Sequence, residues 1–271
     1  MTIRAVSAEL SDDQFRQIKD LLYQTSGINL KPGKENLVKN RLTNRLRTLQ
    51  LADFDAYLCY IAEDESRAEL ITLVDAMTTN KTSFFREQPH FDYISNYLIP
   101  AWAAAGRPLR IWSAGCSSGE EPYSLAMHLC EHYPHSDDVR ILATDLSDTA
   151  LKTAREATYT DAQLADVPAR FKHKYFTKGA SKDTFQVEAK PRSMVYFASL
   201  NLMGQWPMQG PFDLILCRNV MIYFDKATRE NLVNRYWQLL TPAGHLFVGH
   251  SESLSGIENL FRYVQPAVYR R

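Results

Sequence analysis

The segment LRIWSAGCSSGEEPYSLA, residues 109–126, decides the fold class. Its first residues, 109–113, form a short apolar run that predicts a strand, and a turn of small residues follows. The apolar spacing after the turn predicts a helix that ends near His132. The same strand pattern recurs in three further stretches: 139–144, 212–217 and 245–249. A helix is predicted at 226–240, and strands alternating with helices indicate an α/β fold with a parallel sheet covered by helices on both faces.

The first 80 residues predict helices and no strand. Ser11 opens an S-x-x-Q capping box with Gln14, ahead of apolar residues at helical spacing. A further helix is expected after the Pro32-Gly33 turn, and two more at 53–63 and 66–77. We therefore predict the following division: a helical domain at 1–77, a linker that contributes to the cofactor site at 78–90, and a main domain at 91–271.

Residues 175–198 interrupt the alternation of strands and helices. Two strand-like stretches, 184–188 and 194–198, flank a Lys-Pro-Arg sequence that reads as a turn. The pattern predicts a small antiparallel β subdomain inserted into the main domain.

The composition excludes several classes of protein. The chain has 271 residues, of which 45% are hydrophobic, and no apolar run approaches the roughly 18 residues that a membrane span requires, so no membrane insertion is expected. Acidic residues stand where a signal peptide would be apolar, so we expect a cytoplasmic protein. Its 31 basic and 31 acidic residues argue against nucleic acid as a partner. The four cysteines form no CxxC pair and are expected to be free, buried thiols; a monomer is the default expectation.

Two features would meet at the carboxyl ends of the strands, where ligands bind in such sheets. The small-residue turn at 114–119 lets a ligand approach the backbone, and Asp145 ends the next strand, where a carboxylate can accept hydrogen bonds from a ribose. The phosphate-binding G-x-G-x-x-G spacing is absent, and Glu120 and Glu121 begin the helix instead. They would repel a pyrophosphate but could hold an amino group, which favours S-adenosylmethionine. Alternatively, both glutamates merely complement the helix dipole.

Six segments occur in an order that is typical of one family. They are TTNKTSFFRE (78–87), WSAGCSSGEEPYSLA (112–126), ATDLS (143–147), LNL (200–202), FDLILCRNVMIYFD (212–225) and GHSESL (249–254). Together they resemble the CheR family of chemotaxis receptor methyltransferases. The resemblance implies a Rossmann-like methyltransferase fold with the small inserted β subdomain, preceded by an all-helical domain. It also implies methyl esterification of glutamate side chains on the cytoplasmic helices of chemoreceptors, with S-adenosylmethionine as donor and no metal.

The resemblance also assigns roles to individual residues. Arg86, near the methionine end of the cofactor, and Tyr223, near the transferred methyl, would be catalytic. The cofactor would be bound by the following set: Asn80, Thr82, Arg86, Glu121, Asp145, Asn201, Leu202, Arg218 and Asn219. The choice between Glu120 and Glu121 as the ligand of the amino group stays open.

A basic stretch at 31–50 predicts an exposed helix, with six basic residues and one acidic residue. Receptor methylation regions are acidic in this family, and complementary charge speeds encounter. We assign receptor docking to the following residues: Lys34, Lys39, Arg41 and Arg45. The alternative is an ordinary solvated face.

Other interpretations stay open at this point. The chain could methylate nucleic acid or a small molecule, although CRNVMIYF differs from the Asn/Asp-Pro-Pro-aromatic turn of amino-methylating DNA enzymes. It could also be a non-catalytic module that binds the cofactor or a receptor. His128 and His132 share a helix face, but no Glu lies between them as in H-E-x-x-H, so no metal site is predicted.

Overall fold

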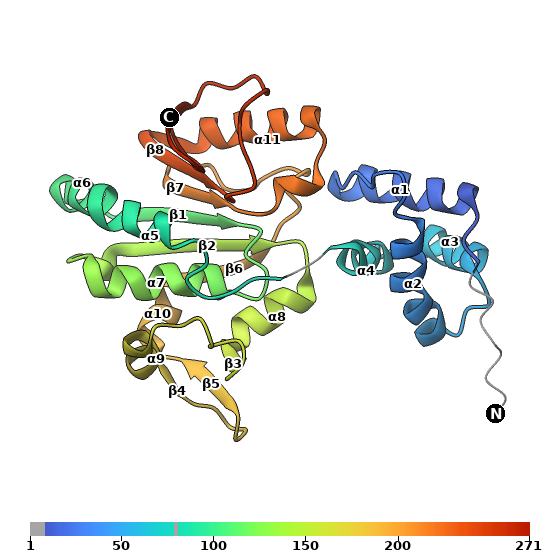
Figure 1. Cartoon of the computed structure of the whole chain (residues 1–271), viewed down its shortest axis with the longest axis horizontal. Coiled ribbons are helices and arrows are strands. Elements are labelled where there is room, and N and C mark those ends of the chain that lie inside the picture. Colours follow the sequence, from blue (N-terminus) through green and yellow to red (C-terminus); the bar gives the residue numbers. More distant parts are fainter. Residues whose placement is uncertain (1–8, 79–80) are drawn as a thin grey trace. The chain divides into compact units, whose positions relative to one another are not determined.

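The computed structural model describes residues 9–78 and 81–271 and divides the chain into two compact units (Figure 1). One unit holds the N-terminal helices together with the segment Tyr223–Thr228, and the other holds the rest of the described chain. Among the described residues, no helix is both long and apolar enough to cross a membrane.

The helical unit contains the helices that the sequence predicts. They are α1 (Asp12–Ser26), α2 (Glu35–Leu49), α3 (Phe54–Glu63) and α4 (Ala68–Met77). The capping box is confirmed, because the Ser11 hydroxyl accepts from the Gln14 N–H and the Gln14 side chain accepts from the Ser11 N–H. Apolar residues at helical spacing, such as Ile18, Leu22 and Leu42, are fully buried and form the core of this unit.

The larger unit is built on a seven-stranded sheet. Its strands are β1 (Leu109–Ala114), β2 (Val139–Asp145), β6 (Val195–Ser199), β7 (Phe212–Cys217), β8 (Leu240–Val248), β9 (Arg262–Gln265) and β10 (Val268–Arg270). They lie in the order β6-β2-β1-β7-β8-β10-β9. The first five are parallel, as the alternation predicts, whereas β10 and β9 add an antiparallel edge.

Helices cover both faces of this sheet. The helices and helical turns between residues 88 and 239 are α5 (Gln88–Tyr93), a π-helical turn (Ile94–Leu98), α6 (Ile99–Ala105), α7 (Glu120–His132), a 3₁₀ turn (Ser136–Asp138), α8 (Asp148–Glu156), α9 (Ala169–Tyr175), α10 (Ala189–Met194), a 3₁₀ turn (Met221–Tyr223) and α11 (Lys226–Leu239). Figure 1 shows α7 on one face and α11 on the other.

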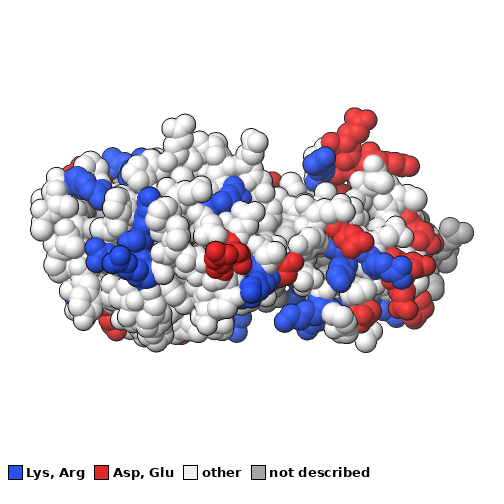
Figure 2. All heavy atoms as spheres, turned by 90° about the horizontal axis from the view of Figure 1, so that it is seen from above, with Lys and Arg blue, Asp and Glu red and all other residues white. Residues whose placement is uncertain are grey.

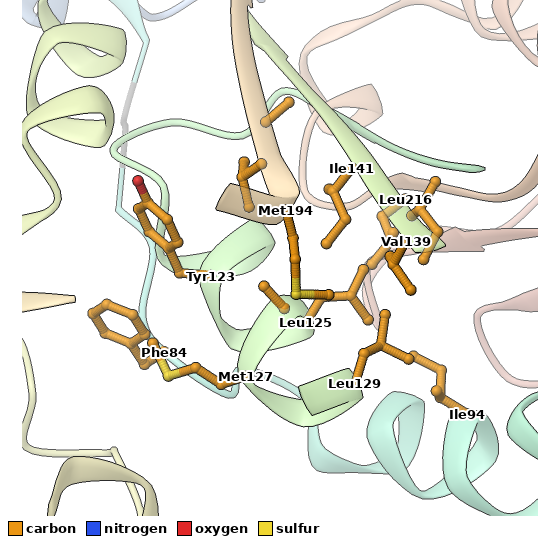
Figure 3. Close-up of a cluster of buried hydrophobic side chains, with 14 of the residues drawn as sticks. Phe84, Ile94, Tyr123, Leu125, Met127, Leu129, Val139, Ile141, Met194 and Leu216 are labelled. Carbon is orange, nitrogen blue, oxygen red and sulfur yellow. The ribbon is translucent and has the colours of Figure 1, made fainter. Parts of the chain in front are cut away.

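Neighbouring residues of β1 supply the two faces of the core. Ile111 belongs to the apolar cluster that α7 completes with Leu125 and Leu129 (Figure 3). Trp112 points to the opposite face, where its ring lies 5.3 Å from that of Tyr236 on α11. Both faces of the central strands are therefore buried, which explains their continuous apolar runs.

The inserted subdomain is a three-stranded antiparallel sheet in the order β3-β5-β4. Its strands are β3 (Thr158–Thr160), β4 (Phe176–Lys178) and β5 (Thr184–Val187). The expected strand at 184–188 is confirmed, but the assignment of 194–198 to this subdomain is wrong. Residues 195–198 belong to β6, which pairs in parallel with β2, whereas Met194 ends α10, and the expected Lys-Pro-Arg turn is part of that helix. An apolar run predicts that a strand forms. It does not predict which other strand it pairs with, because that depends on contacts with residues far away in the sequence.

All four cysteines are free thiols, as predicted. Cys116 and Cys217 are buried and Cys130 is half-buried, but Cys59 is exposed. The expectation of burial is therefore wrong for Cys59, which lies on the outward side of α3.

Candidate active site

The carboxyl ends of β1, β2 and β7 meet where the strand order reverses direction. The turn after β1 is fixed by the Gly115 and Cys116 N–H groups, which donate to the Thr144 carbonyl at 2.8 and 2.9 Å. Gly115 has φ 87°, and a Cβ added there would lie 2.4 Å from the Cγ2 atom of Val220. Glycine is therefore required by conformation and by space, because the chain after β7 packs directly on the turn.

Asp145, the last residue of β2, is held by two backbone donors. Its carboxylate accepts from the Ser117 N–H at 2.8 Å and from the Ser147 N–H at 2.9 Å, one on each oxygen. Burial raises the pKa of Asp145, although these donors oppose the shift. A carboxylate offers about four acceptor positions in all, which is more than the backbone donors occupy. The carboxylate is therefore fixed in place and still able to accept hydrogen bonds from a ligand diol.

The chain that follows β6 lies against the same carboxyl end. The Leu200 N–H donates to the Asp145 carbonyl at 2.9 Å, and the Asn201 side chain accepts from the Met203 N–H at 2.9 Å. The Leu202 carbonyl accepts from Arg235 at 2.7 Å. The structure thus brings Asn201 and Leu202 to the end of the strand beside Asp145.

Arg218 is the charged centre of the site. Its side chain is only 3% exposed and donates to Glu121 at 3.0 Å, to Glu87 at 3.1 and 3.2 Å, and to the Arg86 carbonyl. Glu121 also accepts from the Ser113 hydroxyl at 2.7 Å. Arg218 therefore ties the end of β7 to the start of α7 and to the segment before α5.

Glu87 keeps its negative charge although it is half-buried. Burial raises the pKa of its carboxyl, but the Arg218 charge and the His250 N–H, which donates at 3.1 Å, outweigh burial, so the pKa lies below its usual value. Glu87 and Arg218 therefore form an ion pair in which each partner also makes other hydrogen bonds. An ion pair that is shielded from water needs such additional hydrogen bonds to be stable.

Glu120 and Glu121 occupy different environments. Glu120 is buried and accepts from the Ser118 hydroxyl at 2.7 Å, and burial raises its pKa. Glu121 lies beside the Arg218 guanidinium instead. Of the two carboxylates, Glu121 is therefore the one that shares the charged cluster with Arg218 and Glu87.

The segment before α5 is attached to α7 through its backbone. The Phe85 N–H donates to the Ser124 hydroxyl at 2.9 Å, and that hydroxyl donates to the Glu120 carbonyl. Thr82 is half-buried, and the Arg86 guanidinium donates to the Lys81 carbonyl at 3.3 Å. Asn80, the other linker residue that the sequence suggests, lies outside the described residues.

The chain after β7 carries the remaining expected residues. Asn219 adopts a left-handed conformation (φ 59°), and its N–H donates to Glu252 at 2.7 Å. Tyr223 ends a 3₁₀ turn and is half-buried, and its carbonyl accepts from the Asn29 N–H at 2.9 Å.

Comparisons with known proteins agree with this layout. Residues 80–270 match the family described as CheR methyltransferase, SAM binding domain, and residues 13–78 match the CheR methyltransferase, all-alpha domain. The chain belongs to the CheR methyltransferase family.

Relatives extend the similarity over nearly the whole chain. The chemotaxis protein methyltransferase of Borreliella burgdorferi is 39% identical, and the match covers 98% of this chain and 96% of the relative. Chemotaxis protein methyltransferase 2 of Pseudomonas aeruginosa is 40% identical, covering 95% and 92%. The Escherichia coli chemotaxis protein methyltransferase is 39% identical, covering 96% and 91%. The protein is accordingly an S-adenosylmethionine-dependent methyltransferase.

The residues of the site fit this cofactor. Asp145 offers a half-buried carboxylate with acceptor capacity that suits ribose hydroxyls, and Glu121 offers a second carboxylate that suits an amino group. Acidic groups at the start of α7, in place of a phosphate-binding turn, suit a nucleoside that carries a positive charge and no phosphate.

A cluster of histidines adjoins the charged centre of this CheR-family enzyme. Possible metal-ligand atoms of Glu87, His90 and His250 lie within 4.8 Å of one another. Burial, reinforced by the nearby charge of Arg218, lowers the pKa of His90 to about 3. Arg218 already supplies a positive charge to Glu87, which disfavours a second cation there.

His128, one of the two histidines that share a face of α7, lies outside this cluster. It is buried, and its Nε2 atom lies 2.8 Å from the Ser95 hydroxyl.

Two of the residues that organise the site, Glu87 and Glu252, are absent from the sequence-based set. Both lie in segments that carry the family resemblance, TSFFRE and GHSESL. Their acidic character was visible, but only the structure shows that they are enclosed and that they accept backbone and guanidinium donors. Glu252 stands between the exposed Ser251 and Ser253, so the sequence around it carries no local signal of its burial.

Proposed function

We propose that this enzyme esterifies glutamate side chains on the cytoplasmic helices of chemoreceptors. The observation that carries the proposal is the carboxylate of Glu121, fixed by Arg218 near the end of β1, in a chain that matches chemotaxis protein methyltransferases over nearly its full length. The receptor substrate comes from the activity that this family is expected to have.

The proposed cofactor contacts follow the geometry of the strand ends. Asp145 accepts from the ribose hydroxyls, Glu121 accepts from the amino group, and Asn201 with Leu202 flanks the adenine. Asn219 and Arg218 form the wall beside β7, while Thr82 and Arg86 serve the methionine end; Asn80, which lies outside the described residues, is assigned to that end by the family resemblance alone. When bound, S-adenosylmethionine supplies a methyl group on a positively charged sulfur.

Methyl transfer to a glutamate side chain does not require the protein to move a proton. A glutamate side chain is ionised at pH 7, so methyl transfer to it needs no general base. Charge is neutralised on the way to the transition state, so a tightly bound cation would stabilise the substrate carboxylate more than the transition state. We therefore assign the Tyr223 hydroxyl to orient the carboxylate through a neutral hydrogen bond, and Arg86 to attract it. Alignment of this kind contributes up to about 7–11 kcal/mol in the best intramolecular systems.

The helix α2 is the proposed docking surface for the acidic receptor region. Lys34 is exposed, and Lys39 is half-buried and pairs with the exposed Glu9 at 2.9 Å. Figure 2 shows acidic and basic side chains interspersed over the helical unit, at right in that view, so the attraction that we propose is local to α2.

The two arginines of that surface also have structural partners. Arg45 donates to Glu69, which is 3% exposed and also accepts from the Tyr57 hydroxyl at 2.9 Å. Arg41 donates to the Ala76 and Thr78 carbonyls at the end of α4. We therefore propose that Lys34 supplies most of the attraction, and that Lys39, Arg41 and Arg45, which have partners within the helical unit, add charge from fixed positions.

The test is transfer of a radiolabelled methyl group from S-adenosylmethionine to a purified chemoreceptor cytoplasmic fragment. A glutamyl methyl ester releases volatile methanol in mild alkali, whereas a methylated amine does not. We expect alkali-labile label on the fragment, and none on a fragment whose methylated glutamates are replaced by alanine. Alkali-stable label, or label on nucleic acid in preference to the receptor, would contradict the proposal.

A further inference from the structure

Glu252 is a buried carboxylate in the loop between β8 and β9. Its side chain accepts three backbone N–H groups: Gly249 at 2.6 Å, Asn219 at 2.7 Å and Ile222 at 3.1 Å. Only 8% of the residue is exposed. One carboxylate therefore joins the end of β8 to the turn that follows β7.

The turn at residues 219–222 needs this support. Asn219 has a left-handed conformation, which asparagine adopts more readily than most other residues, and the turn presents N–H groups that no regular helix or strand uses. The end of β8 approaches so closely that a Cβ on Gly249 would lie 2.5 Å from the Asn219 side chain and 2.8 Å from the Glu252 carboxylate. The fit excludes side-chain atoms at position 249.

From this geometry we propose that Glu252 is a positioning residue for methyl transfer. By holding the Asn219 and Ile222 backbones, it sets the direction in which the chain leaves the sheet toward Tyr223, the next residue. The inference rests on the proposed function, because that proposal assigns Asn219 to the cofactor site and Tyr223 to the substrate carboxylate.

A carboxylate is the group that this position requires. All three partners are donors, and an ionised carboxylate only accepts. A glutamine would direct its NH₂ group at one of the N–H groups, and no rotation of the amide avoids that conflict, because both side-chain oxygens of Glu252 are in use.

The rest of the cofactor site is held independently of Glu252. Arg218 is fixed by Glu87 and Glu121, and Asp145 by the backbone of Ser117 and Ser147. Loss of the Glu252 contacts is therefore expected to reduce turnover much more than cofactor affinity.

The test compares Glu252→Gln with Glu258→Gln, a matched control at an exposed glutamate of the same loop. In Glu252→Gln we expect amide hydrogen exchange of residues 219–222 to become about ten-fold faster, in line with the loss of one buried hydrogen bond. We expect kcat to fall about ten-fold or more, with S-adenosylhomocysteine affinity by calorimetry changed by less than about three-fold. Glu258→Gln should match the wild type in all three.

A double-mutant cycle with Tyr223→Phe distinguishes positioning from general destabilisation. If Glu252 acts through Tyr223, the double variant is no slower than the slower single variant. Multiplicative losses, or unchanged exchange at residues 219–222, would overturn the proposal. If Glu252→Gln does not fold, Gly249→Ala disturbs the same contact from the other side and takes its place.

The two proposals fail in different ways. If the wild type transfers no methyl group to receptor fragments, the proposed function fails, and the exchange of residues 219–222 still decides whether Glu252 holds the turn. If the wild type methylates receptors and the exchange is unaffected by Glu252→Gln, only the inference about Glu252 is overturned.

Discussion

Replacing Arg218 with methionine is the most informative perturbation of the charged centre. Methionine has a similar length and keeps much of the packing, but it leaves the Glu87 and Glu121 carboxylates without their shared cation. Those side chains are only 11% and 12% exposed, and that of Arg218 is 3% exposed. Removal of one partner of a buried ion pair costs about 3–5 kcal/mol, so we expect the free energy of unfolding of the larger unit to fall by about that amount at pH 7.

The loss of stability in Arg218→Met should depend on pH. In the wild type the pKa of Glu87 is lowered, so its contribution to stability is complete above the unfolded pKa of about 4.3 and is lost as pH falls through the folded value. Without Arg218, burial remains and raises the pKa of the buried carboxyl. The folded variant then binds more protons than the unfolded chain. Its stability deficit should therefore grow as the pH rises above the unfolded pKa of about 4.3.

The assay is urea denaturation followed by tryptophan fluorescence, since all four tryptophans lie in the larger unit. Arg140→Met is the matched control, because Arg140 is exposed and donates only to nearby carbonyls; we expect a change of about 0.5 kcal/mol or less. A loss below about 1 kcal/mol in Arg218→Met, or a loss that is independent of pH, would refute the assignment of Arg218 as the cation that neutralises both glutamates.

Three further predictions concern binding. Gly115→Val should abolish S-adenosylhomocysteine binding in calorimetry, because the new side chain collides with Val220; Gly106→Val, which also has positive φ but open space around it, should bind normally if it folds. Asp145→Ala should lower the affinity for S-adenosylhomocysteine at least about ten-fold in the same assay, because it removes a fixed, charged hydrogen-bond acceptor. An unchanged affinity would contradict the assignment of Asp145 to the ribose. Lys34→Glu should raise the KM for the receptor fragment several-fold at low salt with kcat unchanged, and this difference should nearly vanish at about 0.5 M NaCl; a difference that persists at high salt would argue against an electrostatic role.

Features with a local cause could be predicted from the sequence. The Ser11 capping box depends on residues three positions apart, and it is present. The strands of the central sheet are apolar runs bounded by turns, and their parallel order follows from the helices between them. Asp145 and the glycine turn after β1 follow from the general location of ligands at strand ends.

Features that depend on distant partners could not be predicted. The segment at 195–199 has the same apolar character as a strand of the small sheet, and only its pairing with β2 places it in the large one. Arg45 reads as part of an exposed basic face until the buried Glu69 is seen beside it. Likewise, the sequence does not distinguish Glu252 from other acidic residues, because the backbone N–H groups that donate to it are known only from the structure.

The long sequence separation within the charged centre has a consequence for when the cofactor pocket forms. Arg218 contacts Glu121 and Glu87 across 97 and 131 residues, and Asp145 contacts Ser117 across 28. Contacts between such distant parts of a chain carry a large loop-closure cost, so the pocket completes only as the whole sheet assembles. A cofactor that recognises this pocket binds the folded chain and not its fragments, and at a hundred times its dissociation constant it adds about 2.7 kcal/mol to stability. In a cell, the supply of methyl donor would therefore also set how long this enzyme survives proteolysis.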